Sequence, residues 1–265
     1  MGLEVHEHIS AINLAGELLV AAAEDAGLET AVPSCPGWRV RDLLAHMGGV
    51  HRWATSYIEC GRPAEATEEE ERAYFAAPPD SELLAWSRDG YQGLVAALGS
   101  AGAGLGCWTF LPAPTPLAFW ARRQAHETSI HAVDAELAAG RAPMPFGAGF
   151  AVDGIDELVN GFFARPGRGP RSEVPASLGV VADDVGERRS WVIQYGPEGA
   201  VRPGSVQVRH CELVGPASDL YLLLWNRARL DQVSVALPDM SARVKVKGKR
   251  DIFDLWQSKA RVRWG

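Results

Sequence analysis

Residues 122–136, RRQAHETSIHAVDAE, bring histidines and acidic side chains close together in the sequence. The zinc-protease motif H-E-x-x-H places its two histidines four residues apart, so that both lie on one face of a helix. His126 and His131 are five residues apart, and at about 100° per residue they point roughly 140° away from each other. Glu127 and His131 are four apart and do share a face. A metal bound by Glu127 and His131 therefore needs at least one more ligand from elsewhere in the chain.

A polar seam runs along the same segment. Stepping by about 100° per residue places a set of side chains within about 80° of one another: Trp120, Arg123, Glu127, His131, Asp134 and Ala138. One interpretation is a solvated face with ion pairs four residues apart, which is common on surface helices. The other is an inward-facing seam that binds a metal, because this helix has no more polar face to turn toward water. In the second case Asp134, one turn beyond His131, is placed to orient that imidazole.

The segment 39–60 is a candidate source of the third ligand. Its apolar side chains form a stripe about 120° wide at helical spacing, which comprises Leu43, Met47, Val50, Trp53 and Tyr57. His46 lies inside this stripe, so we expect it to point into the protein. A buried histidine needs a partner for at least one ring nitrogen, and that partner is either a metal or a carbonyl or carboxylate group. His51 lies near the edge of the stripe, where we expect a structural or an exposed residue.

The elements that position these residues are helices. Apolar residues at helical spacing predict helices over residues 5–26, 39–60, 81–98, 117–139 and 151–165. Ser81 is the expected N-cap of the third. The segment 33–38, PSCPGW, is a proline-punctuated loop that leads into the second helix.

After the PGRGPR loop the pattern changes to short alternating runs, which predict strands at residues 190–196, 205–211, 232–238 and 242–248. Between these runs, GPASDLYLLLWNRA (215–228) is typical of a buried helix that begins near Ser218 or Asp219. We therefore expect an α+β protein that divides near residue 166, with a helical bundle over 1–165 and a smaller α/β domain over 166–265.

Composition indicates an ordinary soluble globular protein and argues against a nucleic-acid binder. The formal net charge is -7 and the pI about 5.5, whereas nucleic-acid-binding domains are usually basic. No run approaches the roughly 18 apolar residues of a membrane span, and the N-terminus has no export signal. Four scattered cysteines without a C-x-x-C pair favour reduced thiols in the cytoplasm. The acidic run 65–72, EATEEEER, is expected to be a solvated loop or helix end.

Two segments together carry a family resemblance. VPSCPGWRVRDLLAHMGGVHRW (32–53), followed by RRQAHETSIHAVDAE, resembles the actinobacterial mycothiol-dependent maleylpyruvate isomerase family, which belongs to the wider DinB-like metalloenzyme group. GPASDLYLLLWNR resembles the C-terminal domain of that family. The resemblance implies a DinB-like four-helix bundle followed by a sterol-carrier-like α/β domain. It also implies a divalent metal, which is zinc in the isomerase itself, with nickel or iron as alternatives; by position the ligands are His46, Glu127 and His131.

The resemblance also implies a reaction. Three protein ligands leave a fourth position open, as in catalytic zinc sites, and a thiol bound there becomes a thiolate. In the isomerase mycothiol supplies this thiol, which adds to a cis double bond; rotation and loss of the thiol then give the trans product. An arginine is expected to bind the substrate carboxylates: Arg227 matches a family arginine, and Arg123 is a second candidate. The alternative for each arginine is a surface salt bridge.

The chain also departs from the family. Lys249 follows Gly248 where the family usually has Gly-Asp, and residues 107–120, CWTFLPAPTPLAFW, are unusually apolar. The aromatic residues of this stretch either line a site for a larger substrate or pack the core: Trp108, Phe110, Phe119 and Trp120.

Several functions therefore stay open. The first is a cytoplasmic mycothiol-dependent isomerase, and the second a mycothiol S-transferase that acts on a larger natural-product or xenobiotic electrophile. A non-catalytic small-molecule binding protein and a metal hydrolase are weaker alternatives. The expected partners are a small-molecule substrate and a low-molecular-weight thiol, and neither a nucleic acid nor a membrane.

Overall fold

The protein is an α+β chain built from two compact units. The computed structural model describes residues 2–165, 169–186, 189–197, 202–203, 209–231 and 239–262. The first unit is Leu3–Pro143, and the second comprises Met1–Gly2 and Met144–Gly265. The first unit is helical and the second contains a mixed sheet, as the sequence predicts.

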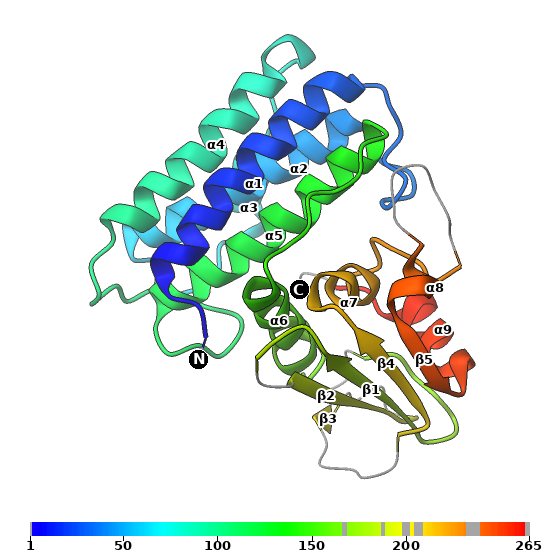
Figure 1. Ribbon diagram of the computed structural model, residues 1–265. Helices are drawn as coiled ribbons and strands as arrows, with labels where there is room; N and C mark the ends of the chain where they lie inside the picture. Colours follow the sequence, from blue (N-terminus) through cyan, green and yellow to red (C-terminus); the bar gives the residue numbers. More distant parts are fainter. Residues whose placement is uncertain are drawn as a thin grey trace. The chain divides into compact units, whose positions relative to one another are not determined.

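Four long helices lie side by side in the first unit (Figure 1). They are α1 (Val5–Ala26), α2 (Val40–Cys60), α4 (Asp80–Ser100) and α5 (Pro116–Ala138), with a short α3 (Glu68–Tyr74) between α2 and α4. The most extensive packing is of α1 against α5 and of α2 against α4. The four predicted helices of the bundle are therefore confirmed.

Two details at the helix starts differ from the sequence-based expectation. Ser81 is not an N-cap, because α4 already begins at Asp80, after Pro79, and has no side-chain cap. The acidic run forms a helix of its own because Thr67 and Glu70 complete a capping box, in which each side chain bonds the backbone N–H of the other residue. None of the residues of α3 is buried, so this acidic helix is solvated.

The interior position of α5 decides between the two interpretations of its polar seam. Every residue from Arg123 to Glu136 is buried, so the solvated-face interpretation is wrong. The helix lies between apolar surfaces of α1 and α2, which include Leu19, Leu43 and Met47. A helix buried on all sides must satisfy its charged and polar groups inside the protein.

The second unit begins with a helix that changes its winding. The helix α6 (Ala148–Asp156) continues into a π-helical segment, η1 (Glu157–Phe162). The sequence predicts one helix over 151–165, and the structure confirms a helical segment there with an earlier start. The ring of Phe146, which precedes α6, lies 5.0 Å from that of Tyr221, and the indole N–H of Trp225 donates to the carbonyl of Gly154 at 3.3 Å.

These contacts explain why the compact units part at 143/144, whereas the sequence places the division near residue 166. The difference is the segment 144–165. It is helical like the bundle, but it packs on α7 of the second unit. Helical periodicity alone does not tell which core a helix joins.

The described residues of this unit include a mixed five-stranded sheet, in the order β3-β2-β1-β4-β5. Its strands are β1 (Ala176–Ala182), β2 (Arg189–Tyr195), β3 (Arg202–Pro203), β4 (Cys211–Gly215) and β5 (Lys245–Gly248). The pair β1 and β4 is parallel and the other neighbours are antiparallel. The helices α7 (Ala217–Leu224) and α9 (Arg250–Lys259) both contact β1 and β4, and the short α8 (Met240–Arg243) precedes β5.

The strand predictions are confirmed for β2 and β5, and the predicted buried helix is α7, which begins after Pro216. The predicted strand at 232–238 and most of that at 205–211 lie outside the described residues. The sequence analysis missed β1, β4 and α9. The reason is clear for β1: it is a central strand with six buried residues in a row, so it has no alternation of polar and apolar residues.

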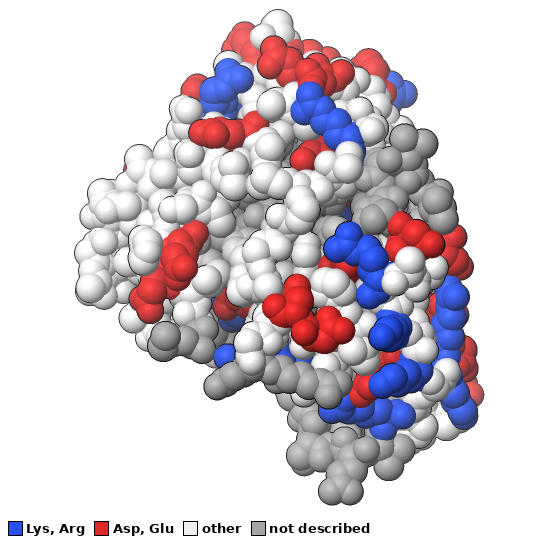
Figure 2. Space-filling model, viewed as in Figure 1, with Lys and Arg blue, Asp and Glu red and all other residues white. Residues whose placement is uncertain are grey.

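The surface of the second unit carries a group of basic side chains. Figure 2 shows lysine and arginine side chains on the side of this unit where β5 and α9 lie. Lys245, Lys247, Lys249 and Arg250 are exposed there. Among the strands that the structure describes, β5 lies at an edge of the sheet, and lysines at a sheet edge discourage pairing with a further strand. Lys249, which stands where the family usually has Asp, is the N-cap of α9 and gives it no side-chain cap.

No helix among the described residues is both long enough and apolar enough to cross a lipid bilayer.

The bundle requires a glycine where α1 and α4 approach each other. A Cβ at Gly16 would lie 2.4 Å from Cγ of the buried Tyr91 ring. We expect Gly16→Ala to lower the free energy of unfolding by about 1–3 kcal/mol, because overpacking a tight contact outweighs the roughly 1 kcal/mol gain in helix propensity. Urea unfolding followed by far-UV circular dichroism measures this change.

The control is Gly93→Ala on α4, where no atom lies within 4 Å of the added Cβ. This variant should gain up to about 1 kcal/mol. Equal stabilisation by both substitutions would contradict the close approach of α1 and α4.

Candidate metal centre

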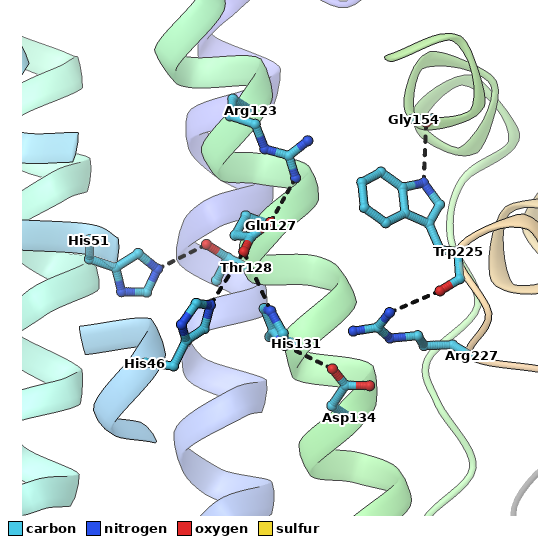
Figure 3. Close-up of polar contacts among 10 residues, drawn as sticks. All are labelled: His46, His51, Arg123, Glu127, Thr128, His131, Asp134, Gly154, Trp225 and Arg227. Carbon is cyan, nitrogen blue, oxygen red and sulfur yellow. Dashed lines mark hydrogen bonds and ion pairs between the residues drawn. The ribbon is translucent and has the colours of Figure 1, made fainter. Parts of the chain in front are cut away.

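The structure brings together three side chains that the sequence analysis singled out as metal ligands. His46 comes from α2, and Glu127 and His131 come from α5; their ligand atoms all lie within 4.8 Å of one another. Nε2 of His46 is 3.5 Å and Nε2 of His131 is 3.4 Å from Oε1 of Glu127. Figure 3 shows the two imidazoles converging on this carboxylate.

Helix geometry explains the convergence. Glu127 and His131 are one turn apart on α5 and therefore share a face. On α2 the inward stripe carries His46 toward α5, and further along Trp53 reaches Trp120, with ring centroids 5.1 Å apart. Because residue numbers rise along α2 as they fall along α5, the two helices run antiparallel.

The three side chains differ in exposure. The side chain of His46 is 21% exposed, whereas those of His131 and Glu127 are 10% and 6% exposed. Of the three side chains, His46 is therefore the most accessible to solvent. Two partly exposed aromatic rings lie near His46: its ring centroid lies 5.0 Å from that of Trp38 and 6.2 Å from that of Phe75.

The two carboxylate oxygens of Glu127 have different partners. Nη2 of Arg123 donates to Oε2 at 2.9 Å, which leaves Oε1 facing the two imidazoles. Burial raises the pKa of Glu127, but hydrogen bonds with His131 and His46 and the charge of Arg123 hold this pKa well below its usual range. Glu127 is therefore an anion in the interior.

The buried position of Arg123, which has no exposed surface, shows that the surface salt-bridge interpretation of this residue is wrong. Its guanidinium forms an interior ion pair with Glu127. The expected contact between Arg123 and a substrate carboxylate stays a prediction.

Asp134 contacts Nδ1 of His131, the ring nitrogen that does not face Glu127. Nδ1 of His131 is 2.8 Å from Oδ2 of the fully buried Asp134. Burial lowers the pKa of His131, whereas hydrogen bonds to Asp134 and Glu127 raise it, and the net shift is upward. When Nδ1–H donates to Asp134, the lone pair of Nε2 is free to face the centre.

The donor set and its charge suit a divalent cation. Two imidazoles and one carboxylate are a common ligand set of catalytic zinc, and imidazole nitrogens also suit nickel and iron. Two buried carboxylates lie beside the imidazole of His131: Glu127, which also pairs with Arg123, and Asp134. Buried carboxylates need cationic or hydrogen-bonding partners, and a divalent cation is one such partner.

His51 also lies in the interior, which excludes the exposed alternative for this residue. It has no exposed surface, and its Nε2 shares a hydrogen bond of 3.0 Å with Oγ1 of Thr128. Burial lowers the pKa of His51 to about 3. His51 is therefore a neutral histidine that links α2 to α5.

His126 points away from the centre, as the five-residue spacing requires. Its ring packs edge-on against that of His8 on α1, with centroids 6.2 Å apart. It is not within ligand distance of the His46, Glu127 and His131 group.

The apolar stretch before α5 forms an aromatic cluster with α2. Phe119 and Trp120 are buried, and Trp108 and Phe110 are half-buried. The Trp120 ring stacks on that of Tyr57 at 4.9 Å, and its indole N–H donates to the carbonyl of Trp108 at 3.1 Å. Phe119 and Trp120 thus pack the core.

Arg227 belongs to the second unit. It is half-buried just after α7, and its Nη1 donates to the carbonyl of Trp225 at 2.9 Å (Figure 3). Its predicted contact with a substrate carboxylate stays a prediction.

The sequence analysis missed the contacts of the PSCPGW loop. The hydroxyl of Ser34 donates to Oδ1 of Asp134, and the thiol of Cys35 donates to Oδ2 at 3.4 Å. The ring of Trp38 stacks on His131, with centroids 6.1 Å apart. The loop belongs to the segment that carries the family resemblance, which marked it as a region of interest. The sequence did not indicate which residues these side chains contact.

Comparisons with known proteins agree on one family. The family model of the mycothiol maleylpyruvate isomerase N-terminal domain matches residues 11–136, and that of the MDMPI C-terminal domain matches residues 149–250. No curated protein sequence matches the chain.

Two solved structures share the fold. A crystal structure of the mycothiol-dependent maleylpyruvate isomerase has 15% sequence identity and a TM-score of 0.58, and the match covers 85% of this chain and 90% of that chain. A histidine-to-alanine mutant of such an isomerase has 14% identity and a TM-score of 0.60, over 92% and 93% of the two chains. At these identities the likeness concerns the fold.

The low pKa of His51 predicts a pH dependence of stability. Between a folded pKa of about 3 and an unfolded pKa of about 6.5, the unfolded chain binds a proton that the folded chain does not. The free energy of unfolding should therefore fall as the pH drops from about 6.5, by up to about 1.4 kcal/mol per pH unit from this group. Denaturant unfolding at several pH values measures the slope.

The matched variant is His51→Gln, whose amide can bond Thr128 but does not titrate. Its free energy of unfolding should fall less steeply over the same pH range. Parallel slopes in the parent and the variant would show that His51 takes up its proton in the folded state.

Proposed function

Because the chain belongs to the mycothiol-dependent maleylpyruvate isomerase family, we propose that it is a metal-dependent enzyme that uses mycothiol to convert a cis unsaturated acid into its trans isomer. The observation that carries this proposal is the convergence of the ligand atoms of His46, Glu127 and His131 within 4.8 Å of one another. Two imidazoles and a carboxylate that meet in a largely buried site are a donor set for a catalytic metal.

Three atoms would hold the metal, which we propose to be zinc: Nε2 of His46, Nε2 of His131 and Oε1 of Glu127. A divalent cation bound there stabilises the thiolate form of a thiol. The partly exposed side of His46 is where mycothiol and the substrate would enter.

The surrounding residues prepare these ligands. Arg123 binds Oε2 of Glu127 and so keeps Oε1 directed at the imidazoles. Nδ1–H of His131 donates to Asp134, so that the lone pair of Nε2 would be available to the metal. Carboxylate partners of this kind fix the ring orientation and tautomer of a ligand histidine.

In the proposed reaction a thiolate would add to one carbon of the substrate's cis double bond, and the displaced electron pair would move onto the conjugated carbonyl as an enolate. The substrate would rotate about the resulting single bond, and collapse of the enolate would form the trans double bond as the C–S bond breaks and the thiolate leaves. A guanidinium matches the planar carboxylates of such a substrate. We propose Arg227 for this role because it matches a family arginine by its place in the sequence, and Arg123, which pairs with Glu127, stays the second candidate.

The apolar surroundings of His46 favour a second candidate function. Phe75 is 39% exposed although it is a large hydrophobic residue, and its ring lies 6.2 Å from that of His46, which is also near the half-buried Trp38. Two aromatic rings at the entrance suit a substrate with an apolar group. Such a substrate could retain the sulfur as a stable thioether, which would make the enzyme a mycothiol S-transferase.

The first test is the metal content of the purified chain, measured by plasma mass spectrometry. We expect about one equivalent of metal in the parent, because three ligands form one site, and its loss in Glu127→Ala and in His131→Ala. His6→Ala, which removes an exposed histidine near the N-terminus, is the control and should keep the metal. A parent that cannot be loaded with zinc, nickel or iron would leave a non-catalytic binding protein as the better hypothesis.

The second test separates the two reactions. The zinc-loaded chain is mixed with mycothiol and maleylpyruvate, and the products are identified by NMR. The isomerase proposal predicts that the trans acid forms and that the amount of mycothiol does not change. Without mycothiol, no trans acid should form. Accumulation of a thioether would support the transferase, and no reaction with a metal-loaded chain would exclude maleylpyruvate as the substrate.

A further inference from the structure

One loop of the first unit contacts both imidazoles of the proposed metal centre without supplying a ligand. This is the PSCPGW loop, residues 33–38, which lies between α1 and α2. We propose that this loop positions the centre, with Ser34 and Trp38 as its positioning residues. The inference rests on the proposed metal site and assigns it a second layer of side chains.

The first contact is a hydrogen-bond relay from Ser34 to His131. The Ser34 hydroxyl donates to Oδ1 of Asp134, and Oδ2 of the same carboxylate accepts from Nδ1 of His131 at 2.8 Å. The Cys35 thiol also donates to Oδ2, at 3.4 Å. With a partner on each oxygen, the buried carboxylate cannot rotate without losing a bond, so the loop fixes the group that orients His131.

The second contact is the indole ring of Trp38. It lies nearly parallel to the ring of His131, with centroids 6.1 Å apart and an interplanar angle of 12°. The same indole lies 5.0 Å from the ring of His46, at 59°. One side chain therefore borders both imidazoles and restricts the rotation of each ring.

The backbone of the loop is itself held firmly. The N–H of Cys35 donates to the carbonyl of Val32 at 3.1 Å, that of Trp38 to Cys35 at 3.0 Å, and that of Val32 to Trp38 at 2.9 Å. Gly37 has a φ of 90°, a value that residues with a Cβ rarely adopt. These bonds make the loop a compact turn from which Ser34 and Trp38 project.

The loop joins the two helices that carry the ligands. It leads directly into α2, which holds His46, and it bonds Asp134 on α5, which is 100 residues away from Ser34 in the sequence. A ligand set split between two helices binds a metal well only when their relative positions are fixed. The loop supplies this constraint by contact with both helices.

The test is the zinc affinity of the full chain, measured by competition with a chromophoric chelator. Groups that orient a ligand histidine typically contribute 10–100-fold to metal affinity, so we expect Ser34→Ala to weaken zinc binding about tenfold. Ser34→Thr keeps the hydroxyl and should restore most of the affinity. The control is Ser56→Ala on α2, where the lost hydroxyl donates to the Trp53 carbonyl, and it should bind zinc like the parent.

A second pair of variants tests the indole independently. Trp38→Phe keeps a flat ring beside the imidazoles and should retain zinc affinity within about threefold, whereas Trp38→Leu should lose about tenfold. Far-UV circular dichroism and thermal midpoints are recorded for every variant, so that loss of the fold is distinguished from loss of affinity. Because zinc binding is measured directly, the readout does not depend on a known substrate.

The outcomes separate this inference from the proposed function. A parent that binds zinc, with Ser34→Ala and Trp38→Leu equal to it within about twofold, overturns the positioning role and leaves the metal site intact. A parent that binds no zinc overturns the metal site and the role of the loop with it. Loss of affinity in Ser34→Ala that Ser34→Thr does not restore shows that the hydroxyl is not the responsible group.

Discussion

The candidate site depends on one buried carboxylate. Glu127 accepts from Arg123 on one oxygen and faces His46 and His131 with the other. An unpaired anion inside a helical bundle would be costly, so the cation of Arg123 has to accompany it into the core. The ion pair also fixes which oxygen points to the imidazoles. The ion pair with Arg123 thus both lowers the cost of burying Glu127 and directs its second oxygen to the imidazoles.

The helix α5 has no side that faces water, so its other polar side chains also need partners inside the bundle. A central helix is normally apolar all round, because polar groups inside need partners. Here Arg123 pairs with Glu127, His131 with Asp134 and Thr128 with His51, so these polar side chains find partners within the bundle. The apolar contacts come from α1 and from the aromatic cluster on α2. These three pairs restrain the site, because each joins residues from different turns or different helices.

The family assignment and the candidate site involve different parts of the molecule. The two family models together match residues of both units, whereas the candidate site lies within the bundle, where the rings of Trp38 and Phe75 lie near that of His46. The proposed metal and thiol would supply chemistry that many electrophiles share. In that proposal the aromatic rings beside His46, rather than the three proposed ligands, would select the substrate.

The sequence by itself determined the local geometry. Helical spacing gave the four bundle helices, put Glu127 and His131 on one face and turned His46 inward, because these properties depend on neighbouring turns alone. It did not reveal the central strand β1, whose burial on both faces removes the alternation, or the attachment of α6 to the second unit. Only the tertiary structure decided that α5 is buried on all sides and that Ser34 bonds Asp134 from 100 residues away. Such contacts depend on which surfaces meet when the helices pack, and a periodic pattern along one segment carries no information about its partner.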